Sequence, residues 1–155
     1  MGTLTAALLA RIRGQSVYFD SNFFIYFLSQ RGRYYEAAKP IMRACDDGQF
    51  IGVTGHLAMS EVLVHPYRQQ SPEEIARVKA LFAREGFLDI VGHDEKTFDL
   101  AAQIRARHGL KLIDALHYAT ALKAGCRFLI SNDTDFKASN AIEVVRLDSL
   151  LAENA

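Results

Sequence analysis

The chain has 155 residues, of which half are hydrophobic and 23% are charged, and this is the size and composition of one ordinary globular domain with its own core. Its 18 Lys and Arg residues balance 18 Asp and Glu residues. No overall positive charge therefore draws it to nucleic acid or to an anionic membrane, so such binding needs a local patch. With only 10 Gly and 3 Pro residues, collagen-like and low-complexity architectures are excluded.

Residues 1–16 precede the first expected strand and form an N-terminal extension of a single domain spanning 1–155. Leu4, Leu8 and Ile12 recur at helical spacing, so residues 3–12 either form a short helix or stay a loosely docked extension. The apolar run at 4–10 is too short to span a bilayer, and its arginines follow it, unlike those of a secretory signal. We expect a cytoplasmic protein without a membrane segment. Its two cysteines, far apart and outside any CxxC motif, are expected to be reduced and buried.

Short runs rich in β-branched and aromatic residues predict five strands, which alternate with helical patterns. The strands are expected at 17–19, 50–53, 87–91, 127–130 and 142–145, and the helices at 22–29, 34–47, 56–67, 72–85, 94–108 and 114–124. A capping box at Ser71 and glycines at 48, 86, 109 and 125 punctuate the helices, and proline predicts a helix end at His65-Pro66. Helical crossovers favour parallel strands, so we expect a three-layer α/β fold: a five-stranded parallel sheet with helices on both faces.

Acidic residues follow two of the expected strands. Asp20 comes directly after the first strand, and Asp133 and Asp135 come after the fourth. In an open parallel sheet, ligands bind beyond the carboxyl ends of the strands. Asp114 begins the helix that leads into the fourth strand, where the helix dipole favours an ionised carboxylate. Glu61 is a lone acid in an apolar helix after the second strand, and Glu is rarely buried without a partner or a cation.

Each acid also has a purely structural interpretation. Asp20 could cap the next helix, Asp114 could be an N-terminal helix charge, and Glu61 could be solvated. One of Asp133 and Asp135 could simply form a turn. The joint pattern favours a site, because separate segments bring acids to one edge. A cluster of oxygen ligands without Cys or paired His suits Mg²⁺ or Mn²⁺, which can activate water for hydrolysis of a phosphodiester.

Four motifs together resemble the PIN domain family. They are residues 17–22 (VYFDSN), Glu61 in its helix, residues 112–121 (LIDALHYATA) and residues 130–136 (ISNDTDF). The likeness extends over residues 17–147 and is greatest to the VapC-type toxins of bacterial toxin–antitoxin pairs. It implies a PIN-like α/β fold and a Mg²⁺- or Mn²⁺-dependent endoribonuclease, usually a homodimer, inhibited by a cognate antitoxin.

The same resemblance implies roles for individual residues. Asp20, Glu61, Asp114 and Asp133 would be the catalytic, metal-coordinating acids, and Ser21 and Asp135 would support them. Ile113 departs from the family, where many relatives carry a smaller or polar residue, and the N-terminal extension is longer than usual. Neither departure removes an acid.

Other residues have weaker claims. His117 shares a helix face with Asp114, but the preferred interpretation is a merely polar face, and His56, His93 and His108 receive no role. Basic residues near the rim and three tyrosines could contact RNA, although solvation or packing explains each more simply. These are Arg31, Arg33, Arg43, Arg68, Lys111, Tyr34, Tyr35 and Tyr67.

Two rival functions stay open. A non-catalytic module of the same fold could bind RNA or a protein, with the acids as a docking surface. A phosphoryl-transfer enzyme with an aspartyl nucleophile is suggested by Asp133 and Asp135, but Asp20-Ser21-Asn22 has no second acid where that chemistry needs one.

Overall fold

The computed structural model describes residues 2–133 and 141–151. Five parallel strands form one sheet in the order β3-β2-β1-β4-β5. They are β1 (Ser16–Phe19), β2 (Ile51–Gly55), β3 (Leu88–Val91), β4 (Phe128–Ser131) and β5 (Glu143–Arg146). The expected five-stranded parallel sheet is therefore confirmed, and each strand lies within one or two residues of its predicted bounds.

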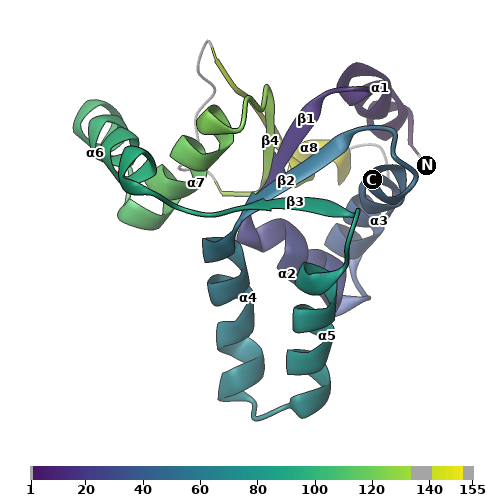
Figure 1. Ribbon diagram of the computed structural model, residues 1–155. Helices are drawn as coiled ribbons and strands as arrows, with labels where there is room; N and C mark the ends of the chain where they lie inside the picture. Colours follow the sequence, from purple (N-terminus) through teal and green to yellow (C-terminus); the bar gives the residue numbers. More distant parts are fainter. Residues whose placement is uncertain (1, 134–140, 152–155) are drawn as a thin grey trace.

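Helices cover both faces of the sheet, which confirms the three-layer arrangement (Figure 1). The described helices are α1 (Thr3–Ile12), α2 (Ser21–Ser29), α3 (Arg33–Asp46), α4 (His56–Arg68), α5 (Pro72–Ala83), α6 (Glu95–His108), α7 (Leu112–Lys123) and α8 (Leu147–Leu151). In Figure 1, α4 and α5 form a hairpin that projects from the body of the molecule. No helix in the described part of the chain is long and apolar enough to cross a membrane.

The central strand β1 joins two hydrophobic cores because alternate side chains of a strand point to opposite faces. Val17 and Phe19 belong to a cluster shared with α2, α3, α4 and α5. Tyr18 belongs to the other cluster, with residues of α6 and α7. Cys45 and Cys126 are buried and free, one in each cluster, which confirms the expectation for the cysteines. A polar tyrosine in the second cluster needs a hydrogen-bond partner, and α7 provides it.

The N-terminal extension is a docked helix rather than a loose segment. Leu8 and Ile12 of α1 are buried in the first cluster. Arg11 forms an ion pair with Glu143 of β5, at 2.6 Å between Nη2 and Oε2. The apolar spacing that suggested a helix thus reflects contact with the core, while the ion pair links α1 to the edge of the sheet.

Helix punctuation was predicted correctly in part; of the capping box expected at Ser71, the structure gives the half made by the serine. The four glycines at 48, 86, 109 and 125 all adopt positive φ as expected. The Ser71 hydroxyl accepts the Glu74 N–H, while the Glu74 side chain lines a groove. The predicted helix end at His65-Pro66 is wrong, because α4 continues to Arg68. Pro66 is buried and lines the space between α4 and its neighbours, so tertiary packing outweighs the local disfavour before proline.

Candidate active site

The carboxyl edge of the sheet collects the elements that carry the four expected acids. Strands β1 and β4 are paired in parallel, so Asp20 and Asp133, which follow them, lie at the same edge. Helix α4, which carries Glu61, starts directly after β2 at this edge. Helix α7 runs back toward the start of β4, and this orients its first turn, with Asp114, toward the edge as well. The edge therefore receives acids from four separate segments.

Asp20 is the deeply buried acid of this edge, with 2% of its surface exposed. Its Oδ1 atom accepts the Phe23 N–H at 3.1 Å, so the residue caps α2. Its other oxygen, Oδ2, accepts a hydrogen bond from the Ser131 hydroxyl at the end of β4. The interpretation of Asp20 as a helix cap is thus confirmed for Oδ1, while Oδ2 contacts a different strand.

Burial makes the charge of Asp20 costly. Desolvation raises the pKa of this carboxyl from 3.8 to about 6, although the Ser131 hydrogen bond, the His117 ring and the Phe23 N–H all act to lower it. The negative charge of Glu61 raises the same pKa further. Asp20, Glu61 and His117 therefore lie within electrostatic reach of one another, and a positive charge placed among them would be favoured.

Glu61 and Tyr18 meet at the ring of His117, which is 2% exposed. The Nε2 atom of His117 lies 2.6 Å from Oε1 of Glu61, and its Nδ1 atom lies 2.7 Å from the Tyr18 hydroxyl. Glu61 itself is half-buried. Helix α7, helix α4 and strand β1 are linked through this one imidazole. The polar stripe on α7, which the sequence suggested to be merely polar, is an internal contact.

The remaining site residues are placed less tightly. Asp114 is half-buried in the first turn of α7, one turn before His117. The Asp133 N–H donates to the Ser131 hydroxyl at 2.9 Å, so Ser131 joins this segment to Asp20. Ser21 is buried at the start of α2, and Asp135 lies outside the described residues.

A ready-formed coordination shell is not seen within 2–133 and 141–151, where no three His, Cys, Asp or Glu side chains form a group that could hold a metal ion. Asp20 and Glu61 are instead held by hydrogen-bond partners, the former by Phe23 and Ser131 and the latter by His117. Neighbouring carboxylates repel one another when both are ionised. The hydrogen-bond donors around Asp20 and Glu61 partly offset this repulsion. As a donor set, the four acids provide only oxygen atoms, which suits a hard cation.

His93 contributes to the site indirectly and was missed. Its Nε2 atom accepts the Leu57 N–H at 3.2 Å, in the first turn of α4, and its Nδ1 atom faces the Thr120 hydroxyl of α7 at 3.2 Å. Burial lowers the pKa of this imidazole, which favours the neutral form that can accept. His93 therefore anchors the helix that carries Glu61. His93 and Leu57 are 36 positions apart, so no local sequence pattern predicts their contact.

The expected basic rim residues are exposed, as solvated side chains would be. Arg31, Arg33, Arg43, Arg68 and Lys111 all lie at the surface. Two of the three tyrosines have evident packing partners. Tyr34 stacks on Tyr26 with ring centroids 4.5 Å apart and donates its hydroxyl to Asp148 at 2.7 Å. Tyr35 lies against Phe27, with ring centroids 6.1 Å apart.

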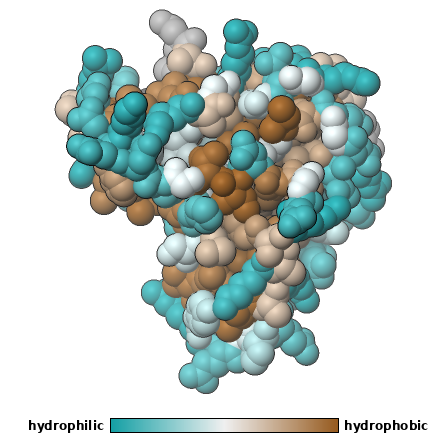
Figure 2. Space-filling view, viewed as in Figure 1, coloured by the Kyte–Doolittle hydropathy of each residue, from teal (hydrophilic) through white to brown (hydrophobic). Residues whose placement is uncertain are grey.

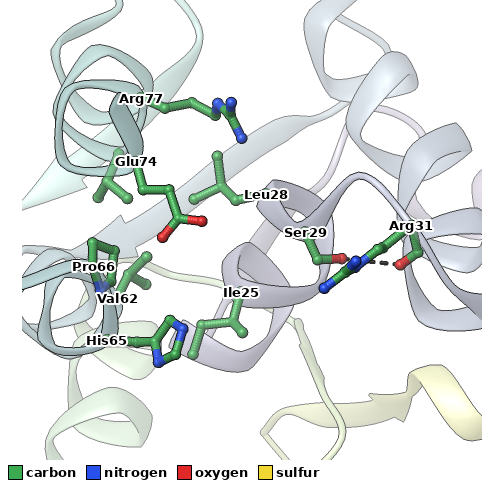
Figure 3. Close-up of a pocket in the computed structure, with 10 residues that line it drawn as sticks. Ile25, Leu28, Ser29, Arg31, Val62, His65, Pro66, Glu74 and Arg77 are labelled. Carbon is green, nitrogen blue, oxygen red and sulfur yellow. Dashed lines mark hydrogen bonds between the residues drawn. The ribbon is translucent and has the colours of Figure 1, made fainter. Parts of the chain in front are cut away.

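A groove lies between α2, α4 and α5 and has a volume of about 510 Å³. Its lining combines apolar side chains, among them Ile25, Leu28 and Val62, with the charged Arg31, Arg77 and Glu74 (Figure 3). Figure 2 shows apolar side chains gathered in the middle of the visible face and continuing onto the projecting α4–α5 hairpin. Because α2 begins at the cap Asp20 and α4 carries Glu61, this groove and the acid edge share two helices.

By its fold, the protein is an α/β domain with a five-stranded parallel sheet in the order β3-β2-β1-β4-β5 and acidic residues at the carboxyl ends of its strands. A family model for the PIN domain matches residues 17–142. The chain belongs to the PIN domain family.

Solved structures share its fold. A toxin–antitoxin complex from Klebsiella pneumoniae has a TM-score of 0.66 at 22% identity, covering 84% of this chain and 97% of that one. VapC20 of Mycobacterium tuberculosis, a toxin that cleaves the sarcin–ricin loop, has a TM-score of 0.67 at 18% identity, covering 83% and 98%. VapBC2 from Rickettsia felis, bound to a DNA fragment from its promoter, has a TM-score of 0.64 at 13% identity, covering 84% and 98%. No curated protein matches the sequence.

Proposed function

We propose that this protein is a divalent-metal-dependent endoribonuclease and the toxin of a toxin–antitoxin pair. The observation that carries the proposal is the buried Asp20 carboxyl, whose pKa is raised by desolvation and by nearby Glu61. A buried acid beside a second acid is a poor choice for stability alone, because its charge costs free energy. A cation bound at this edge offsets that cost. Membership of the PIN family and the fold of the VapC toxins support the same assignment.

In this proposal Asp20, Glu61, Asp114 and Asp133 hold Mg²⁺ or Mn²⁺, with Ser21 and Asp135 in support. A divalent cation bound there would polarise a phosphodiester and favour attack by water. The chain's own residues do the positioning. Ser131 orients the Asp20 carboxylate through its hydroxyl and accepts the Asp133 N–H, and His117 holds Glu61. All the proposed ligands are oxygen atoms, as these cations prefer.

The test combines cleavage and metal binding. Purified protein should cut RNA in Mn²⁺ or Mg²⁺ and not in EDTA, and expression in a bacterium should stop growth. Asp20→Asn and Asp114→Asn should abolish both while the far-UV circular dichroism stays native, whereas Asp99→Asn on the exposed face of α6 should change neither. At a hundredfold excess over Kd, Mn²⁺ should increase the free energy of unfolding of the wild type by about 2.7 kcal/mol. Its melting temperature should rise accordingly.

Cleavage retained in both variants contradicts the assignment of the acids. RNA binding without metal-stimulated cleavage in the wild type favours the rival function, a non-catalytic RNA- or protein-binding module. A covalent phosphoenzyme would instead indicate an aspartyl nucleophile.

The proposed protein partners are a second copy of the chain and a cognate antitoxin. For the antitoxin the groove between α2, α4 and α5 is suited, because its apolar floor fits the apolar face of an amphipathic segment. Its two arginines outnumber the one carboxylate, Glu74, and so favour a segment that carries acidic residues. Ile25 lines this groove and Val64 of α4 does not, yet both are 44% exposed. Ile25→Glu should therefore abolish the rescue of growth by a co-expressed cognate antitoxin, and Val64→Glu should not. Equal rescue with both variants would rule out the groove. Sedimentation of the purified chain checks the dimer.

A further inference from the structure

His117 is an unusual side chain for the interior of this protein. It is almost fully buried on α7, in a stretch where its neighbours Ala115, Leu116 and Ala119 are apolar. Burying an imidazole costs free energy unless its nitrogen atoms are hydrogen-bonded. Both nitrogens have partners here, Tyr18 at 2.7 Å and Glu61 at 2.6 Å. A leucine would fill a similar space without the desolvation cost of a polar ring. The two hydrogen bonds are therefore what distinguish histidine at this position.

The direction of the two hydrogen bonds follows from what each partner can do. A carboxylate only accepts hydrogen bonds, so Nε2 of His117 carries the hydrogen and donates it to Oε1 of Glu61. Desolvation raises the pKa of the Tyr18 hydroxyl, which therefore keeps its proton. That proton can be donated to Nδ1, so both ring nitrogens have a hydrogen-bond partner. The chain of donors runs from Tyr18 through His117 to Glu61.

The contact constrains the acid more than the histidine. Glu61 is 34% exposed in its side chain, whereas His117 is 2% exposed. A partly exposed glutamate on a helix samples several rotamers, and ordering its side chain costs conformational entropy. The ring of His117 has little rotational freedom, because it is buried on α7 and its Nδ1 atom is hydrogen-bonded to Tyr18. The bond to Nε2 therefore selects one position for Oε1 and leaves Oε2 outside the contact.

We propose that His117 is a positioning residue that holds the Glu61 carboxylate in the orientation the metal site uses, with Tyr18 fixing the ring from the opposite side. The inference rests on the proposed function and assigns to it a second layer of residues, drawn from β1 and α7. Partners of this kind, which orient a ligand without touching the metal, typically change metal affinity or activity by about 10–100-fold when they are removed. In this proposal His117 orients Glu61 and does not itself touch the metal.

The test measures Mn²⁺ affinity by titration calorimetry and RNA cleavage in parallel. His117→Leu should weaken Mn²⁺ binding and lower kcat by about 10–100-fold, with little change in KM for RNA. His117→Gln, which restores an N–H donor near the position of Nε2, should recover most of the loss. Tyr18→Phe, which removes only the hydroxyl, should give a smaller loss than His117→Leu. His108→Leu, at an exposed site on α6, is the control and should change neither quantity.

A double-mutant cycle separates positioning from a general structural role. In a Glu61→Ala background, adding His117→Leu should cause no further loss of Mn²⁺ affinity, because no side-chain oxygen then remains at position 61 for the histidine to orient. An additive loss overturns the proposal. If His117→Leu fails to fold, the double variant Tyr18→Phe/His117→Leu replaces it, since removing both buried partners of a hydrogen bond costs less than leaving one unpaired.

The failures of the two proposals can be told apart. A wild type that binds Mn²⁺ and cleaves RNA, together with a folded His117→Leu protein that does both equally well, overturns the positioning role and leaves the nuclease proposal intact. A wild type that neither binds Mn²⁺ nor cleaves RNA overturns the nuclease proposal and the positioning role with it.

Discussion

Removing the charge of Asp20 should make the protein more stable above pH 6. The carboxyl has a pKa of about 6 in the folded protein and 3.8 as its ordinary value. Because the folded state keeps the proton to a higher pH, the unfolded chain binds fewer protons in this window, and the free energy of unfolding falls as the pH rises from about 4 to 6. A shift of about two pKa units corresponds to about 3 kcal/mol.

Asp20→Asn preserves the size of the side chain and its ability to cap α2, but it has no proton to release. Relative to the wild type, the variant should therefore gain about 3 kcal/mol of stability between pH 4 and pH 7, or roughly 6–12 °C in melting temperature. Urea unfolding without added metal, followed by circular dichroism across this range, measures the difference. Asp89→Asn, at an exposed position of β3, controls for general charge effects. Parallel stability curves for the wild type and Asp20→Asn would refute the reasoning.

Three further substitutions test contacts around the site and the extension. Gly55→Ala should cost about 1–3 kcal/mol, because its Cβ would lie 2.7 Å from Cε1 of His93, while Gly92→Ala, with no atom within 4 Å, should be nearly neutral in chemical denaturation. Ile12→Ala should cost about 2–5 kcal/mol if α1 is part of the core, whereas Leu4→Ala, at a residue 46% exposed, should cost little; equal melting temperatures would contradict docking. Ser131→Ala should destabilise the protein by about 1–3 kcal/mol and raise the pKa of Asp20 further, which NMR titration of the carboxyl can follow, with exposed Ser149→Ala as the control.

The sequence alone predicted the alternation of strands and helices along the chain and the parallel sheet, and it led to the hypothesis of acids at one sheet edge; the strand order and α8 came only from the structure. Residues 17–19 alternate between two buried faces, and Gly48, Gly109 and Gly125 adopt the left-handed conformation at or next to the C-caps of α3, α6 and α7. Gly86 has the same conformation, but α5 already ends at Ala83. These signals are local, since backbone preference and the burial of adjacent side chains produce them within a few residues. The acids followed from the same logic, because parallel strands with helical crossovers bring their carboxyl ends together.

Only the tertiary structure decided how the polar groups pair. Tyr18 and His117 are 99 positions apart, and Asp20 and Ser131 are 111 apart, so no spacing rule links them. The dual role of Asp20 as helix cap and buried acid, the support of α4 by His93 and the continuation of α4 through Pro66 depend on the same long-range packing. Hydrogen bonds between side chains require contact geometry accurate to a few tenths of an ångström, and this is set by the whole fold rather than by any one segment.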